Sequence, residues 1–320
     1  MDTILTKIQK LGISLRLYNK NKKDGVYMMD TAGFILKYWF AMPAIKTKNY
    51  ESISAFLGFC TFFLNLLKKI KPKYIVCAFD ESLGSCFRNK IFPDYKKNRE
   101  KAPQELKIQF KLCRNFLDLL GINNLASKKY EADDIINTLS INTRKTGMSN
   151  IIFTNDKDLF QIIYKNDIWW NLNDRKFNYS DLKNKLSFSP QNLPDFLGLM
   201  GDSVDNIPGA PGIGEKTASM LICKYKNIEN VFNNIDSIPS DLGAKYQRYA
   251  KIITENEEMI RLSKHLSTLA YIDSIENNDG LIERGRVHLN KIDDFLLQTG
   301  MNPGQKKSWI SQIENSCEIV

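Results

Sequence analysis

Histidine is nearly absent from this chain, and its cysteines show no pairing pattern. Among 320 residues there are two histidines, His265 and His288, and six cysteines, none of them in a CxxC or metal-finger spacing. The chain therefore has few residues that could form a zinc site or a histidine-based catalytic triad, and we expect neither. Several cysteines fall inside apolar runs, where a thiol behaves as a small core residue, so we expect a reducing compartment, the cytoplasm.

Long apolar runs are missing as well. The longest, Phe56 to Leu67, is interrupted by Asn65 and is shorter than the ~20 residues that span a bilayer. The first 24 residues lack the continuous apolar region of a secretory signal, so we expect a short helix there, with an organellar presequence as the alternative. At 43% hydrophobic and 25% charged residues, the composition is that of a globular protein of about two domains.

Acidic residues are outnumbered by basic ones. The 45 Lys and Arg against 36 Asp and Glu give a net charge of +9 and a pI near 9.0, which favours a polyanionic partner. The basic segment, Cys86 to Lys111, carries eight cations against three acids, a net charge of +5, with Phe87, Phe92 and Tyr95 interleaved. Cations beside aromatic rings suit single-stranded nucleic acid, whereas a merely solvated face is the alternative.

Three short apolar runs each lead into carboxylates. The runs are 26–29, 74–79 and 150–154, and the acids that follow them are Asp30, Asp80, Asp156 and Asp158. Separated by helical patterns such as 103–120 and 131–144, these runs predict buried parallel strands of an α/β sheet, with a further strand at 167–170. Ligands bind at the carboxyl edge of such a sheet, so the acids should meet there. From about residue 190 helices joined by Gly/Pro turns replace strands.

More acids accompany those at the strand ends. Glu131, Asp133 and Asp134 begin the helix at 131–144, and Asp202 and Asp205 precede a glycine-rich turn. Acids in a first turn can simply favour the helix dipole. Nine gathered carboxylates, however, could not all stay ionised without cations, and an oxygen-only donor set suits Mg²⁺ or Mn²⁺. Two such ions about 3.5–4 Å apart can hydrolyse a phosphodiester, which is the chemistry that we expect.

The stretch from Asn206 to Ala218 is the most specific in the chain. Its glycines permit tight turns and close approach of the backbone to a ligand, and a helix that starts near Gly214 presents free N–H groups to a phosphate. The spacing is not that of a Walker A loop. A plain connection between two helices is the alternative.

On these residues the chain resembles the structure-specific 5′-nucleases, and most closely the 5′-nuclease domain of bacterial DNA polymerase I. The resemblance covers about residues 26–270 and is strongest at 130–134, 154–159 and 196–218. It implies an α/β fold with a PIN-like parallel central sheet flanked by helices. The expected parts are an N-terminal extension (1–24), a nuclease core (25–189) with a helical arch at about 82–111, a helical subdomain (190–265) with a helix–hairpin–helix, and a C-terminal segment without an assigned role (266–320).

The resemblance also implies roles for individual residues. All nine acids that the family uses for two Mg²⁺ or Mn²⁺ ions are present, namely Asp30, Asp80, Glu131, Asp133, Asp134, Asp156, Asp158, Asp202 and Asp205. Lys96 matches the lysine at the scissile phosphate, and Lys96, Arg88 and Asp133 are the expected catalytic residues. The residues expected to contact DNA are Arg88, Lys90, Tyr95, Lys96, Arg99, Gly209, Gly212, Gly214, Lys216 and Thr217. A K⁺ at the helix–hairpin–helix is also expected.

Besides Cys86, where threonine is common, and Lys97, where a small residue is common, two positions depart from the family pattern. Asp30 is followed by Thr31-Ala32-Gly33 where a glycine usually follows the acid directly, and Lys37 stands where an arginine is common. The first change affects the local loop, and the second replaces a bidentate phosphate fork with a point charge. Neither removes an expected metal ligand.

The resemblance thus implies a Mg²⁺-dependent 5′–3′ exonuclease or flap endonuclease of DNA replication and repair, acting on 5′ flaps, nicks and ends. It would leave a 5′-phosphate and a 3′-hydroxyl, and it would work as a monomer near the nucleoid without a membrane partner. The alternatives are a non-catalytic binder of branched DNA and an RNA-cleaving nuclease on a related core. Asp156, Asp158, Asp202 and Asp205 argue against a pure binder, which would have no need of them. The hairpin suits regular duplex backbone and so disfavours an RNA nuclease, although RNA primers stay a possible substrate.

Overall fold

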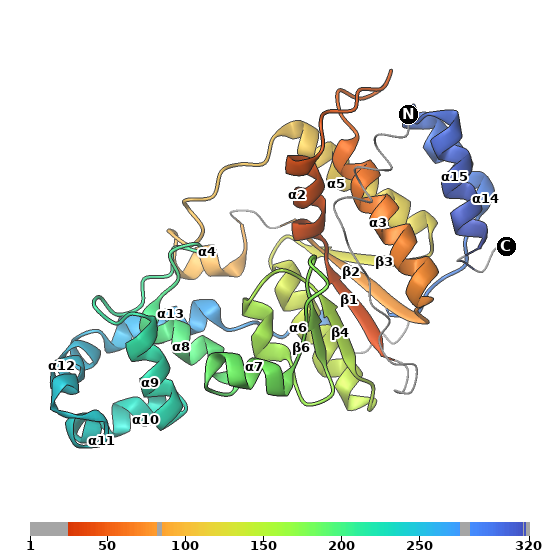
Figure 1. Cartoon of the computed structure of the whole chain (residues 1–320). Coiled ribbons are helices and arrows are strands. Elements are labelled where there is room, and N and C mark those ends of the chain that lie inside the picture. Colours follow the sequence, from red (N-terminus) through yellow and green to blue (C-terminus); the bar gives the residue numbers. More distant parts are fainter. Residues whose placement is uncertain (1–24, 82–84, 276–281, 316, 318–320) are drawn as a thin grey trace.

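A six-stranded sheet forms the centre of the computed structural model, which describes residues 25–81, 85–275, 282–315 and 317 (Figure 1). The strand order is β3-β2-β1-β4-β5-β6. The strands are β1 (Val26–Asp30), β2 (Tyr74–Asp80), β3 (Asn123–Ser127), β4 (Asn150–Phe153), β5 (Ile168–Trp170) and β6 (Lys176–Asn178). The first five pair in parallel, and β6 is antiparallel to β5. The helix expected in residues 1–24 lies outside the described residues.

The four strands predicted from apolar runs, β1, β2, β4 and β5, are confirmed as neighbours in this sheet. Strands β3 and β6 carry no such signal. The sequence of β3 is Asn-Asn-Leu-Ala-Ser, all of it half-buried at one edge of the sheet, and β6 is a three-residue strand at the other edge. An apolar run marks a strand that is buried on both faces, so strands at a partly solvated edge escape the pattern.

Helices cover both faces of the sheet. One layer holds α2 (Thr31–Ala41), α3 (Ser54–Ile70) and α5 (Gln104–Leu119), and the other holds α6 (Ala132–Lys145). Alternate strand residues feed the two cores, with Met29 and Phe79 packed in the first and Met28 and Val76 in the second. The helices predicted at 103–120 and 131–144 are confirmed as α5 and α6.

The C-terminal residues complete the first layer, which the sequence pattern does not predict. Helices α14 (Leu289–Gln298) and α15 (Pro303–Glu314) lie beside α3 and α5 (Figure 1). Trp309 packs against Phe56 and Phe116, with ring centroids 5.7 and 5.2 Å apart. Burying large aromatic side chains in this way stabilises the fold, because apolar area is removed from water.

A helical region follows β6. It contains α7 (Tyr179–Leu186), α8 (Leu193–Met200), α9 (Glu215–Tyr225), α10 (Ile228–Asn233), α11 (Ile238–Leu242), α12 (Gln247–Glu255) and α13 (Glu257–Ser267). These helices share the second core with α6, and α8 packs along α13. In Figure 1 they extend to one side of the sheet, on the side where α4 lies.

The segment expected to be a helical arch is mostly not helical. Within the described residues 85–103, α4 (Phe87–Ile91) is a five-residue helix, and turns follow it. Residues 104–111 belong instead to α5, whose Leu106 and Leu112 are buried in the first core. The apolar stripe of α5 therefore takes the last residues of the expected arch, 104–111, into the core.

Candidate active site

Acidic side chains from four elements meet at the carboxyl edge of the sheet. Asp30 ends β1, Asp80 ends β2, Asp156 follows β4, and Asp133 lies in the first turn of α6. Two of them are fixed by hydrogen bonds: Thr154 Oγ1 donates to Asp30 Oδ2 at 2.9 Å, and the Ala132 N–H donates to Asp80 Oδ1 at 2.8 Å. The parallel strands thus deliver their terminal carboxylates to one place, as the sequence predicts.

These acids are held where ionisation is unfavourable. Burial, and then the charges of Asp80 and Asp156, raise the pKa of Asp30 from 3.8 to about 7. Burial and the charges of Asp156, Asp30 and Asp80 raise the pKa of Asp133 well above its ordinary value. Carboxyls that ionise this reluctantly need an added positive charge to stay anionic near neutral pH.

A second acidic group adjoins the first. Carboxylate oxygens of Asp158, Asp202 and Asp205 lie within 4.8 Å of one another. Burial, and then the charges of Asp156, Asp205 and Asp202, raise the pKa of Asp158 to about 8. Because Asp156 acts on both groups, we treat the eight carboxylates together as the acid pocket: Asp30, Asp80, Glu131, Asp133, Asp156, Asp158, Asp202 and Asp205.

The donor set of the acid pocket fits hard divalent cations. The acid pocket offers carboxylate oxygens as ligands. Among the described residues, no histidine or cysteine belongs to the group formed by Asp158, Asp202 and Asp205. Oxygen ligands of this kind suit Mg²⁺ or Mn²⁺ better than Zn²⁺. Burial, and then repulsion between neighbouring carboxylates, raise the pKa values of Asp30 and Asp158, and bound cations would offset both effects.

Two cations of the basic segment already reach into the acid pocket. Lys96 Nζ lies 2.6 Å from Glu131 Oε1 and 3.4 Å from Asp205 Oδ2, and Arg99 Nη2 lies 2.5 Å from Asp205 Oδ1. Burial would raise the pKa of Glu131, but the charges of Lys96 and Arg88 outweigh it and hold that pKa below its ordinary value. Glu131 is therefore ionised where its neighbours resist ionisation.

The loop that carries these cations is docked on the turn that carries Asp202 and Asp205. The Lys96 N–H donates to the Asp205 carbonyl at 2.9 Å, and Asn206 Nδ2 donates to the Asp94 carbonyl at 2.7 Å. Asn98 Nδ2 donates to the Ser203 carbonyl at 3.0 Å. Asn98 and Asn206 are positioning residues that no spacing in the sequence marks, because they connect segments more than 100 residues apart.

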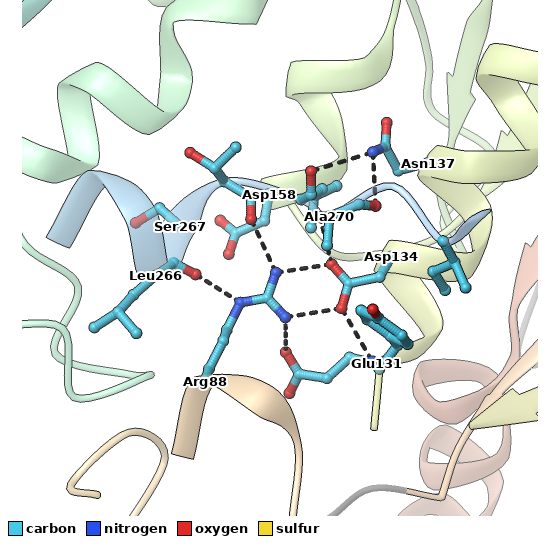
Figure 2. Close-up of polar contacts among 12 residues, drawn as sticks. Arg88, Glu131, Asp134, Asn137, Asp158, Leu266, Ser267 and Ala270 are labelled. Atoms are coloured by element: carbon cyan, nitrogen blue, oxygen red, sulfur yellow. Dashed lines mark hydrogen bonds and ion pairs between the residues drawn. The ribbon is translucent and has the colours of Figure 1, made fainter. Parts of the chain in front are cut away.

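Asp134 is the one expected metal ligand that does not join the acid pocket. Its side chain is fully buried and faces Arg88, whose Nη1 and Nη2 donate to its two carboxylate oxygens at 2.8 Å each (Figure 2). The N–H groups of Glu131 and Ala270 donate to the same two oxygens. Adjacent helical residues point about 100° apart, so Asp133 and Asp134 face different surroundings.

The residues expected to contact DNA divide into exposed and buried ones. Lys90, Arg99, Lys216, Gly212 and Gly214 are exposed, and Lys96 lies at the rim of the acid pocket. Two others do not meet the expectation in this structure: Arg88 is 1% exposed, and Tyr95 is 4% exposed with its hydroxyl donating to Glu131 Oε2. Gly209 and Thr217 are also buried.

The glycine-rich stretch forms a turn between two helices, α8 and α9. Gly209 has a φ of +62°, and a Cβ there would lie 2.3 Å from the Gly201 nitrogen, so the turn requires glycine. A Cβ on Gly214 would meet no atom within 4 Å. The turn therefore leaves an open backbone surface at the start of α9, and Asp202 and Asp205 precede it by a few residues. One helix precedes this turn and another follows it, as the expected helix–hairpin–helix requires.

The unfolding temperature without divalent ions should rise as the pH is lowered from 8 to 6. Asp30 and Asp158 have pKa values of about 7 and 8 in the folded state against 3.8 ordinarily, so the folded state takes up protons that the unfolded state does not. Their contribution to stability is full below pH 4 and is lost as the pH rises through 7 and 8. Thermal unfolding in EDTA at pH 6, 7 and 8 measures this, and repetition with Mn²⁺ should reduce the slope. A midpoint in EDTA that rises with pH across this range contradicts the assignment.

Comparison with known proteins gives matches along most of the chain. Residues 25–187 match a family described as 5′-3′ exonuclease, N-terminal resolvase-like domain, and residues 188–278 match one described as 5′-3′ exonuclease, C-terminal SAM fold. The chain is 35% identical over 277 residues to a 5′-3′ exonuclease of Aquifex aeolicus, covering 86% of this chain and 92% of that protein. It is 31% identical over 249 residues to DNA polymerase I of Caldicellulosiruptor bescii, covering 76% of this chain and 28% of that protein.

Solved structures share the fold at lower identity. A complex of the bacteriophage T5 flap endonuclease with DNA and metal ions aligns with a TM-score of 0.60 and 18% identity, covering 91% of this chain and 99% of that one. The catalytic core of Rad2 in complex with DNA substrate aligns with a TM-score of 0.60 and 16% identity, covering 91% of this chain and 93% of that one. Separately, none of the helices in the described part of the chain is long and apolar enough to cross a membrane.

Proposed function

Since this chain belongs to the 5′-3′ exonuclease family, we propose that it hydrolyses phosphodiesters at 5′ flaps, nicks and ends of DNA with two Mg²⁺ or Mn²⁺ ions. The acid pocket carries the proposal. Eight carboxylates from distant parts of the chain gather at the carboxyl edge of the sheet, next to a partly exposed glycine turn and the cations Lys96 and Arg99. A protein that only bound branched DNA would have no need to gather them.

The acids divide between two ion sites. Asp30, Asp80, Glu131 and Asp133 would hold one ion, and the second would lie among Asp156, Asp158, Asp202 and Asp205. When bound, such ions activate a water and stabilise the leaving oxygen of a phosphodiester. The carboxylates themselves remain acceptors; Asp30 is buried, and Asp133 is half-buried.

Lys96 and Arg99 supply positive charge at the rim of the acid pocket. Both are paired with acids of the pocket, Lys96 with Glu131 and Arg99 with Asp205. A scissile phosphate bound beside these side chains would find cations already in place, and preorganised charge lowers the energy of a transition state without reorganisation. The docked loop 94–99 thereby couples the phosphate position to the second ion site.

The turn between α8 and α9 is proposed to hold duplex backbone. Free N–H groups at the start of α9 and the exposed Lys216 favour a phosphate there. A K⁺ bound by main-chain carbonyls of this turn is part of the same proposal. Because Asp202 and Asp205 lie just before the turn in the chain, a duplex bound at the turn is held at a fixed distance from the acid pocket.

Lys216→Ala should weaken binding to duplex DNA and flatten its salt dependence. One lost phosphate contact reduces the slope of log K against log salt by about one. Fluorescence anisotropy between 50 and 200 mM salt would measure the slope. Lys307→Ala is the matched control, since Lys307 is exposed on α15 at the other end of the molecule. An unchanged slope for Lys216→Ala would remove it from the interface.

A substrate panel tests the proposed function directly. A 5′ flap, a nicked duplex, a gapped duplex and an RNA–DNA hybrid would each be incubated with Mg²⁺ and with EDTA. Cleavage of the flap and nick in Mg²⁺, with none in EDTA, is expected. Binding without cleavage would favour the branched-DNA binder, and cleavage confined to RNA would favour the RNA nuclease.

A further inference from the structure

Arg88 lies at the junction of three segments that meet beneath the acid pocket. It belongs to α4, and its five N–H groups reach the first turn of α6 and the residues at the end of α13 (Figure 2). Nε donates to the Leu266 carbonyl at 2.8 Å and Nη2 to the Thr268 carbonyl at 3.0 Å. The guanidinium has five N–H donors, so no donor is left for a phosphate.

Asp134 is engaged just as fully. Each of its oxygens accepts one bond from Arg88 and one from a backbone N–H, that of Glu131 at 3.1 Å or that of Ala270 at 2.8 Å. A carboxylate that accepts four hydrogen bonds, two of them from a guanidinium, is satisfied without an ion. Its side chain has no solvent exposure.

The pair acts on the acid pocket through Glu131. Arg88 Nη1 donates to Glu131 Oε2 at 3.0 Å, and Tyr95 donates to the same oxygen, which leaves Oε1 for Lys96. Lys96 in turn contacts Asp205 twice, through its side-chain Nζ and through its backbone N–H. A change at Arg88 is therefore transmitted to Glu131 and, through Glu131, to Lys96, the cation expected at the phosphate. Arg88 itself reaches the metal site only through its bond to Glu131.

We infer that Arg88 and Asp134 are a positioning pair: Asp134 holds Arg88 instead of a metal ion, and Arg88 sets the orientation of Glu131 and Lys96 for cleavage. The inference rests on the proposed nuclease function. It replaces two roles that the sequence suggests, Arg88 as a phosphate contact and Asp134 as a metal ligand. Small displacements of a catalytic group are costly, since an error of about 1 Å can reduce a rate about 100-fold.

The test compares Arg88→Met with a matched control. Arg144→Met removes another arginine that is paired with a buried aspartate, Asp167, at 2.7 Å, but at the far end of α6. In single-turnover cleavage of a 5′ flap by the full chain, Arg88→Met should slow the reaction about 10- to 100-fold, and Arg144→Met should not. The affinity of Arg88→Met for the flap in EDTA should stay within about threefold, with an unchanged salt slope.

A double-variant cycle separates positioning from loss of stability. If Arg88 acts through Lys96, then Arg88→Met should slow the Lys96→Ala variant much less than it slows the wild type, because coupled residues are not additive. Should Arg88→Met fail to fold, the variant with both Arg88→Met and Asp134→Leu keeps the test available, since replacing a whole buried ion pair by apolar residues is often tolerated. It should show the same slow cleavage.

Three results would overturn the inference. They are a loss of DNA affinity with a salt slope smaller by about one, an additive effect with Lys96→Ala, and a cleavage rate equal to that of Arg144→Met. Failure of the proposed function is recognised separately, because the wild type would then not cleave the flap in Mg²⁺ at all.

Discussion

Asp133→Asn should reduce cleavage of a 5′ flap in Mg²⁺ by about 1,000-fold or more, while flap binding in EDTA stays within about threefold. Asp133 lies among Asp156, Asp30 and Asp80, so its carboxylate belongs to the group that would hold the water-activating ion. Removing one charged ligand weakens binding of the ion, and with it the effect of the ion on the pKa of its bound water. Binding should persist because the expected duplex contacts lie at the turn between α8 and α9.

The same substitution should stabilise the protein when no divalent ion is present. Burial and the three neighbouring charges raise the pKa of Asp133, so its ionised form is unfavourable in the folded state. An amide of the same shape removes that repulsion, and active sites commonly trade stability for function. Thermal unfolding in EDTA at pH 8 should therefore show a higher midpoint than the wild type.

Asp181→Asn is the matched control for Asp133→Asn. Asp181 occupies the first turn of α7, outside the acid pocket, where it serves a capping box. We expect the cleavage rate and the pH dependence of the unfolding temperature in EDTA to stay unchanged. Loss of the capping interaction should lower the unfolding temperature slightly. Full turnover by Asp133→Asn in Mg²⁺, or a lowered unfolding midpoint in EDTA, would remove Asp133 from the metal site.

Lys96→Ala is the second large effect, with an expected loss of about 100- to 1,000-fold in the single-turnover rate. Lys96 is held at the pocket rim by Glu131 and Asp205, and its side chain is 17% exposed. Its charge is therefore fixed beside the acids before any substrate arrives, and such preorganised cations act chiefly on the transition state. The measurement is single-turnover cleavage with enzyme in excess.

Lys97→Ala is the control for Lys96→Ala, because it removes the same charge one residue away. The Lys97 side chain is 72% exposed and pairs with Asp94, so its loss should change the rate less than about threefold. If the two variants behave alike, the effect belongs to the overall charge of the loop and not to the position of Lys96.

The main parts of the candidate site could be predicted without coordinates. Apolar runs that end at Asp30, Asp80 and Asp156 predict parallel strands, and parallel strands bring their carboxyl ends to one edge. The glycine pattern around Gly209 predicts a turn between helices, because a positive φ at a crowded position requires glycine. These are local signals, carried by residue type and short spacing.

Other features depend on contacts between distant residues. Arg88 and Leu266 are 178 positions apart, and no pattern near either residue indicates that they bond. The half-buried edge strand β3 and the packing of α15 on α3 likewise depend on contacts between residues far apart in the sequence. Local periodicity reports how a segment relates to solvent, but it does not identify the partner that covers it.

The sequence by itself determined the α/β sheet, the acids at its carboxyl edge and the glycine turn, because each follows from the chemistry of a few neighbouring residues. Only the tertiary structure decided that Asp133 faces the acid pocket while Asp134 faces Arg88. The helix separates the two side chains by about 100°. Which direction leads to the acid pocket and which to a buried guanidinium was set by residues 266–270, whose backbone groups bond to Arg88 and Asp134.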